Sequence, residues 1–148
     1  MRVLKTGNEL MEQNKMYPVK HENEVTEKKV PGRYLRWVVD RKGEGLDGEF
    51  CSCCIMRVEP GQTVSPAHCH PSGEEMLYII NGSGKVYIDG TIYPFSAGSA
   101  VMFQKGKVHM VRNTGAEELK VACFFAPATS LEEYEFHPEI DFDGGTEV

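Results

Sequence analysis

The sequence predicts an all-β fold, a sandwich or a barrel, over residues 34 to about 126. Short runs of β-branched and aromatic residues follow one another at a spacing of about 8–12 residues, and turn dipeptides separate them. No stretch of this region shows a sustained 3.6-residue hydrophobic period. A length of 148 residues corresponds to about one domain. We therefore expect a single β domain.

The strands follow from these runs in chain order. The dipeptide Asp89-Gly90 is the strongest hairpin signal, because both central residues of a type I′ turn need a positive φ. The expected strands cover 34–40, 52–59, 75–80, 85–89, 91–95, 99–104, 107–112 and 119–126.

The ends of the chain are predicted to be extensions of this β domain. Residues 1–33 form an N-terminal extension, with a short helix at 9–15 and a remainder that wraps the barrel or pairs with a neighbouring strand. Residues 34–127 form the barrel, and 128–148 form an acidic C-terminal tail in which 131–136 is expected to behave like the N-terminal extension. The division is therefore 1–33, 34–127 and 128–148, in one domain overall.

Charge is distributed unevenly. The chain has 16 basic and 22 acidic residues, for a net charge of −6. Residues 129–148 hold seven acidic residues and no Lys or Arg, so the other 128 residues carry 16 basic and 15 acidic groups. No basic stripe of the kind that binds nucleic acid is present, so we expect no nucleic-acid partner. The tail is predicted to be solvated.

No apolar run approaches the roughly 18 residues that span a bilayer, and the first residues lack an apolar signal core. The sequence thus predicts no membrane association and no secretion. Five cysteines are then expected to be free thiols in a reducing cytoplasm. Cys51, Cys53 and Cys54 lack the spacing of a C-x-x-C pair, so packing in a strand is favoured over a zinc knot.

Three histidines and a glutamate form the candidate chemical site. His68 and His70 are two residues apart, so on a strand both imidazoles point to one face. Glu75 follows one tight turn later and can return beside them, whereas adjacent Glu74 would point to the opposite face. His109 lies in a later strand; taken alone, it could equally be a half-buried histidine with its hydrogen bonds satisfied.

Two stretches resemble the conserved motifs of the cupins. Residues 61–82, GQTVSPAHCHPSGEEMLYIING, are similar to the first motif, and 98–113, GSAVMFQKGKVHMVRN, are similar to the second. The fifteen residues between them match the short intermotif spacing of small single-domain bacterial cupins. Two departures are present: six residues rather than five separate Gly61 from His68, and Gln104 replaces a proline. Both concern local geometry rather than ligand identity.

The resemblance implies a double-stranded β-helix, or jelly-roll, barrel. It also implies that His68, His70, Glu75 and His109 bind one divalent metal inside it. Three imidazoles and one carboxylate suit Fe, Mn, Ni, Co, Cu or Zn, so the sequence leaves the identity of the metal open. Four ligands leave up to two positions on a six-coordinate ion for a small molecule.

The reaction is left open by the fold, because cupins include isomerases, dioxygenases, decarboxylases, lyases and non-catalytic binding proteins. We expect a metal-dependent enzyme acting on a small organic acid or sugar-like metabolite. The alternative is a non-catalytic small-molecule binding or sensor cupin. No residue is identified as a general base, so the catalytic residues are unknown. A purely structural metal protein is less favoured, because structural sites are usually closed clusters.

The remaining side chains yield weaker expectations. Leu77, Ile79, Val111 and Asn113 are placed on the site face by strand alternation. Met56 and Met102 are expected in the core. A homodimer is expected, because exposed jelly-roll edges need cover. Candidate substrate contacts, each more simply explained as a surface or cross-strand partner, are Arg36, Arg57, Tyr78, Tyr93, Gln104 and Arg112.

Overall fold

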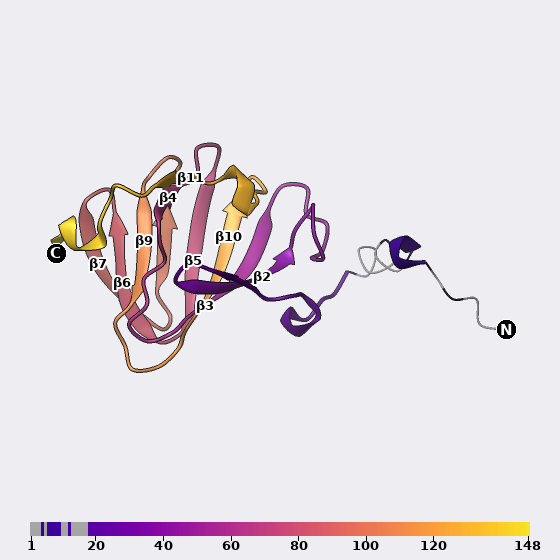
Figure 1. Cartoon of the computed structure of the whole chain (residues 1–148), viewed down its shortest axis with the longest axis horizontal. Coiled ribbons are helices and arrows are strands. Elements are labelled where there is room, and N and C mark those ends of the chain that lie inside the picture. Colours follow the sequence, from indigo (N-terminus) through magenta and orange to yellow (C-terminus); the bar gives the residue numbers. More distant parts are fainter. Residues whose placement is uncertain (1–3, 5, 10–11, 13–17) are drawn as a thin grey trace.

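The described residues form two six-stranded sheets in the computed structural model shown in Figure 1. The structure describes residues 4, 6–9, 12 and 18–148. Most of the helix expected at 9–15 lies outside these residues. The strands are β1 (Lys28–Val30), β2 (Arg33–Val39), β3 (Ser52–Val58), β4 (Ala67–Cys69), β5 (Glu74–Asn81), β6 (Ser83–Ile88), β7 (Thr91–Ser96), β8 (Ala100–Phe103), β9 (His109–Asn113), β10 (Leu119–Ala126), β11 (Glu135–His137) and β12 (Thr146–Glu147).

Sheet A has the order β1-β2-β3-β10-β5-β8, and sheet B has the order β11-β4-β9-β6-β7-β12. Strands far apart in sequence are neighbours, since β10 lies between β3 and β5 and pairs antiparallel with both. This arrangement confirms the predicted all-β jelly-roll barrel. No helix formed by the described residues is long and apolar enough to cross a membrane.

Strand alternation builds the core between the sheets. In β5, Glu75, Leu77 and Ile79 are buried while the residues between them are exposed. Trp37 of β2 and Phe125 of β10 stack with ring centroids 5.3 Å apart. Apolar inward faces of this kind supply most of the stability of a β barrel. The same alternation fixes which face of each strand can reach the barrel interior.

The turn between β6 and β7 confirms the predicted hairpin. Asp89 and Gly90 have φ values of 45° and 94°, both in the left-handed region that a type I′ turn requires. Met56 and Met102 were both expected in the core. This is confirmed for Met56, which is 4% exposed, and wrong for Met102, which is 45% exposed. Met102 lies on the edge strand β8 and points outward, between the inward-facing Val101 and Phe103 positions.

The acidic C-terminal segment folds back onto the barrel. Its carboxylates are exposed, as expected, but β11 pairs with β4 and Phe142 is 3% exposed. The pairing of β11 with β4 agrees with the expectation that 131–136 wraps the barrel or pairs with a neighbouring strand. The expectation of a solvated tail is wrong for the backbone beyond it, since Phe142 is buried, and without β11 the strand β4 would be an unpaired edge. Two 3₁₀ helices, η2 (Leu131–Glu133) and η3 (Phe142–Gly144), lie in this segment, and a third, η1 (Glu22–Glu24), precedes β1. The exact boundaries 1–33, 34–127 and 128–148 stay a prediction.

Candidate metal centre

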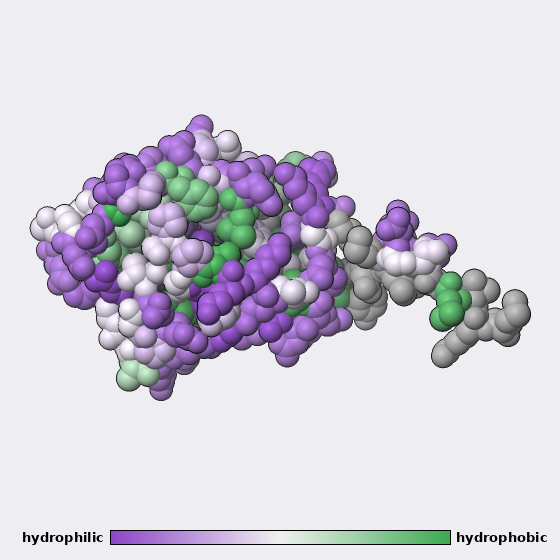
Figure 2. Space-filling view, in the orientation of Figure 1, coloured by the Kyte–Doolittle hydropathy of each residue, from purple (hydrophilic) through white to green (hydrophobic). Residues whose placement is uncertain are grey.

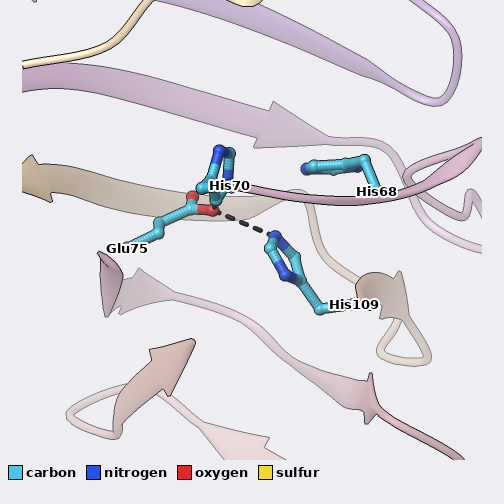
Figure 3. A group of neighbouring side chains, drawn as sticks. All are labelled: His68, His70, Glu75 and His109. Carbon is cyan, nitrogen blue, oxygen red and sulfur yellow. Dashed lines mark hydrogen bonds and ion pairs between the residues drawn. The ribbon is translucent and has the colours of Figure 1, made fainter. Parts of the chain in front are cut away.

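Four buried side chains meet at one end of the barrel interior (Figure 3). His68 lies in β4, His70 follows it directly, Glu75 lies in β5 and His109 begins β9. One candidate ligand atom from each lies within 4.8 Å of all the others, and the four residues are only 2–6% exposed. The structure therefore brings together all four residues named from the sequence.

Local pairing explains how the chain assembles this group. His68 and His109 are direct cross-strand partners in sheet B. The backbone N–H of Gly106 donates to the carbonyl of His70 at 3.0 Å, which ties the segment before β9 to the turn after β4. Glu75 points inward and Glu74 is exposed, so the choice of Glu75 over Glu74 agrees with strand alternation.

In two of the imidazoles, one ring nitrogen is hydrogen-bonded to a backbone carbonyl oxygen. Nδ1 of His68 lies 3.2 Å from the carbonyl oxygen of Pro66, and Nδ1 of His109 lies 2.8 Å from that of Lys107. In a neutral ring these nitrogens carry the proton and donate, so the Nε2 atoms present lone pairs to the interior. Backbone carbonyls orient metal-binding histidines in this way.

Glu75 is the anion at the centre of the group. Its Oε2 lies 2.7 Å from Nε2 of His70 and 3.1 Å from Nε2 of His109. If the proton of His109 is on Nδ1, the Nε2 lone pair faces a carboxylate oxygen of Glu75 and the two repel each other. A cation bound between them would remove this repulsion. Nδ1 of His70 is buried without a hydrogen-bond partner among the described residues. The donor set thus fits a metal ion.

Burial and charge set the protonation of the group. Burial alone would raise the pKa of Glu75, but hydrogen bonds and charge from His109 and His70 lower it well below its ordinary value. Burial lowers the pKa of His68, and the charges of His109 and Arg33 lower it further. The site therefore favours an ionised carboxylate and a neutral His68, the forms that bind metals.

Aromatic rings hold the imidazoles in place. Phe103 stacks on His109 with ring centroids 3.7 Å apart and an angle of 6° between the planes. Tyr134, between η2 and β11, stacks on His68 at 4.9 Å and meets His70 edge-on at 4.4 Å. Rings packed at these distances restrict the rotation of the imidazoles. The C-terminal segment thus contributes one wall of the site.

A cavity of about 20 Å³ lies against this group, enough for little more than one water molecule. The sequence pattern correctly put Leu77 and Val111 on its walls, whereas buried Asn113 bonds to backbone carbonyls instead. Polar and titratable residues that the sequence reasoning missed also line it: Arg33, Cys54, Cys123 and Tyr134.

Arg33 could have been found from the sequence. It is 6% exposed and points inward, like Leu35 and Trp37 at the next alternate positions of β2. Starting the strand one residue too late, at residue 34, hid this alternation. Tyr134 had no comparable signal, because its segment lies in the acidic tail and reaches the site through tertiary folding.

The substrate contacts suggested from the sequence lie outside this cavity. Arg36 and Arg57 both bond to Glu27 on the outer face of sheet A. Arg112 bonds to Thr63 and Asp143. Tyr78, Tyr93 and Gln104 are exposed. These side chains are therefore surface and cross-strand partners, the explanation that the sequence favoured, and none of them lines the cavity.

Comparison with known proteins agrees with this architecture. The family model for the cupin domain matches residues 54–125, which contain all four residues of the cluster. The chain is a cupin. Its cupin domain contains a His-His-Glu-His cluster suited to metal binding.

Individual relatives cover different shares of the chain. The polyketide synthase CurC of Streptomyces cyaneus is 31% identical over 104 residues, 70% of this chain and 66% of the relative. A probable oxalate decarboxylase of Arthroderma benhamiae is 31% identical over 123 residues, 79% of this chain but 30% of the relative. The cupin chain thus spans less than two thirds of the length of these curated relatives.

Solved structures show the same fold at lower identity. A variant of Streptomyces PAC13 with uridine superimposes with a TM-score of 0.68 and 15% identity, covering 82% of this cupin and 92% of PAC13. At this identity, the likeness concerns the fold alone. The chemistry of the present site has to be argued from its own residues.

Proposed function

We propose that this cupin is a metal-dependent enzyme acting on a small metabolite that carries a carboxylate. His68, His70, Glu75 and His109 would hold one divalent transition metal per chain, with Fe, Mn, Ni, Co, Cu and Zn all compatible with the donor set. When bound, the ion supplies Lewis-acid polarisation of a substrate oxygen, and open coordination positions allow that contact.

The buried side chain of Arg33 is the main evidence for a substrate that carries a carboxylate. Its side chain lines the same cavity as Glu75, His68 and His109. None of the ion pairs formed by the described residues includes Arg33, although it is 6% exposed. A buried arginine without a carboxylate partner is costly, and it offers a planar fork for a carboxylate ligand. A substrate anion would complete this pair.

Tyr134 offers the second polar contact. Burial and the charge of Glu75 raise the pKa of its phenol well above the ordinary value, so the hydroxyl keeps its proton near neutral pH. A protonated phenol can donate a hydrogen bond to a substrate oxygen. Arg33 and Tyr134 would thus orient the substrate, and the apolar walls would exclude water from it.

Entry of a substrate requires the site to open. A cavity of about 20 Å³ is far smaller than the roughly 300–1,000 Å³ of the pockets that hold small-molecule ligands. The part of the C-terminal segment that carries Tyr134 covers His68 and His70, and its strand β11 pairs with β4 over three residues. We therefore infer that movement of η2 and β11 admits the substrate. The name of the relative from Arthroderma, a probable oxalate decarboxylase, also supports a carboxylate substrate.

Substrate screening tests this function. Metal-free protein is reloaded separately with each of the six metals and mixed with panels of mono- and dicarboxylic, hydroxy, oxo and sugar acids, and consumption is followed by NMR. We expect turnover of a carboxylate in at least one metal form. Arg33→Gln should weaken substrate binding by at least about 2 kcal/mol, roughly 30-fold. Arg36→Gln, a matched arginine on the outer face of the same strand, should leave binding unchanged.

Binding without turnover is the alternative function. Besides the four cluster residues, the cavity walls in the described chain include no carboxylate or histidine to serve as a general base. A ligand that binds but persists unchanged in every metal form would identify a sensor or carrier. Failure of all carboxylates both to bind and to react would overturn the proposed substrate class.

A homodimer is the assembly we propose. Apolar side chains on the outer face of sheet A are 39–47% exposed and come from three adjacent strands, and a partner subunit would cover them. They are Met76, Tyr78, Ile80, Met102 and Phe124. Figure 2 shows one face of the molecule, which is mostly hydrophilic with hydrophobic patches. All five cysteines are free thiols, which supports a cytoplasmic location.

A further inference from the structure

A second group of metal-binding side chains lies on the outer face of sheet B. Cys69 is in β4, and Glu135 and His137 are in β11, which pairs with β4 and lies beside it in Figure 1. Glu135 is the direct cross-strand partner of Cys69, and His137 lies two residues further along the same face. One ligand atom from each lies within 4.8 Å of the other two.

We propose that Cys69, Glu135 and His137 form a second binding site for a divalent metal of the zinc type. Nε2 of His137 lies 3.7 Å from Sγ of Cys69 and 3.1 Å from Oε1 of Glu135. A thiolate, an imidazole and a carboxylate are the three ligand types that zinc uses in proteins, and three such ligands leave one position for water.

A fourth residue orients the imidazole of this site. Oε1 of Glu139 lies 3.2 Å from Nδ1 of His137, on the side of the ring away from Cys69. When a carboxylate accepts a hydrogen bond from Nδ1–H, the Nε2 lone pair is directed at the metal position, which is the usual arrangement behind a zinc-bound histidine. His137 is thus already held in the orientation that metal binding needs.

Charge and access also favour a cation. None of the ion pairs of the described residues joins Glu135 or Glu139 to a lysine or arginine; both carboxylates pair with His137. Cys69 is 4% exposed, whereas the side chains of His137 and Glu135 are 25% and 58% exposed. The thiol therefore forms the floor of a site that an ion can enter from solvent.

The second site is separate from the barrel centre. Alternation along β4 and the turn after it points His68 and His70 into the barrel and Cys69 away from it. The sulfur ligand also distinguishes the two sites chemically, because the barrel group has only nitrogen and oxygen donors. An ion at the outer site would fasten β11 to β4 and so hold Tyr134 over the barrel opening.

Titration of the metal-free, full-length protein with Co²⁺ tests the proposal. Cobalt bound to a thiolate gives an intense near-ultraviolet charge-transfer band, which a site of imidazoles and a carboxylate lacks. We expect the wild type to bind two equivalents, one of which produces this band. Cys69→Ser and His137→Gln should each lose the band and one equivalent, while His109→Ala should keep the band. His21→Gln, a histidine in η1's cap, is the matched control and should behave as wild type.

Glu139→Gln provides a graded test of the orienting contact. The affinity of the outer site should fall by about 10- to 100-fold, with no change at the barrel centre. The proposal is overturned if wild type shows no thiolate band, or if the band persists in both Cys69→Ser and His137→Gln. Circular dichroism establishes whether each variant is folded. If Cys69→Ser does not fold, His137→Gln still tests the site, because the His137 side chain is partly exposed and its replacement disturbs the fold less. His109→Ala should lose the Co²⁺ bound at the barrel centre and keep the Co²⁺ bound at the outer site. This variant therefore distinguishes a failure of the outer site from a failure of the proposed function, which depends on the barrel centre.

Discussion

Nε2 of His109 lies 3.1 Å from a carboxylate oxygen of Glu75, although Nδ1 of the same ring already lies 2.8 Å from the Lys107 carbonyl. A neutral imidazole has one N–H, so it cannot donate to both oxygens. The pair is stable with a cation at Nε2, either a proton or a metal ion. The account of the site depends on this relationship.

Removing the His109 imidazole should therefore remove the barrel metal. We predict that His109→Ala lowers the affinity of the barrel centre by more than about 100-fold, because even the partners behind a metal ligand contribute 10- to 100-fold. Elemental analysis of the freshly purified protein and competition with a chelator measure the loss. His21→Ala is the control, and equal metal content in wild type and His109→Ala would contradict the assignment.

The metal-free protein should become less stable as the pH falls. Burial depresses the pKa of His68 in the folded state, so the unfolded chain takes up this proton first as the pH drops through about 6.5. The stabilisation is complete above that pH and decreases below it, by up to about 1.4 kcal/mol per pH unit for one proton. Urea unfolding between pH 8 and 5 measures the slope. His68→Gln should reduce the slope, and an unchanged slope would contradict the prediction.

Phe103 should be important for stability as well as for the site. It is 1% exposed and stacks on His109, so Phe103→Ala should lower the free energy of unfolding by about 3–5 kcal/mol. Phe50 is 77% exposed, and Phe50→Ala should change it by no more than about 0.5 kcal/mol. Similar unfolding free energies for the two variants in chemical denaturation would contradict the packing described.

Tyr134 should control access to the barrel centre. Tyr134→Ala removes the ring that covers His68 and His70, so metal should pass to an added chelator several times faster than in wild type. Tyr134→Phe keeps the ring and should release metal at the wild-type rate. Stopped-flow measurements with a coloured chelator compare the three proteins. Equal rates in all three would show that this ring does not close the site.

The apolar face of sheet A should be a dimer interface. Light scattering of wild type should give twice the chain mass of 16.6 kDa. Ile80→Glu places a charge among the exposed apolar side chains and should give a monomer that remains folded. Phe50→Glu, exposed elsewhere, should stay dimeric. A monomeric wild type would contradict the proposed assembly.

The strand pattern predicted an all-β sandwich or barrel, and the resemblance to the cupin motifs implied the jelly-roll barrel and the four clustered residues. His68, His70 and Glu75 lie within eight residues of one another, so local geometry alone nearly determines their common face. His109 is more distant, and its approach depends on the β4–β9 pairing that the motif resemblance implied.

The rest of the site depends on tertiary contacts that have no periodic signal. Tyr134 and β11 lie in a segment of polar and acidic residues, and only their pairing with β4 brings them to the barrel. For Arg36 and Arg57, the face of the strand could be deduced, but not the presence of Glu27, which pairs with both. Partners supplied by a distant segment decide whether an arginine faces a substrate or a carboxylate of the same chain.

Anomalous diffraction from crystals grown with the metal present tests the central claim most directly. The account predicts a peak inside the barrel, within about 2.0–2.2 Å of a nitrogen of His68, His70 and His109 and an oxygen of Glu75. Crystals containing the metal that show no peak among these four side chains, with the histidines bonded only to protein, would contradict it.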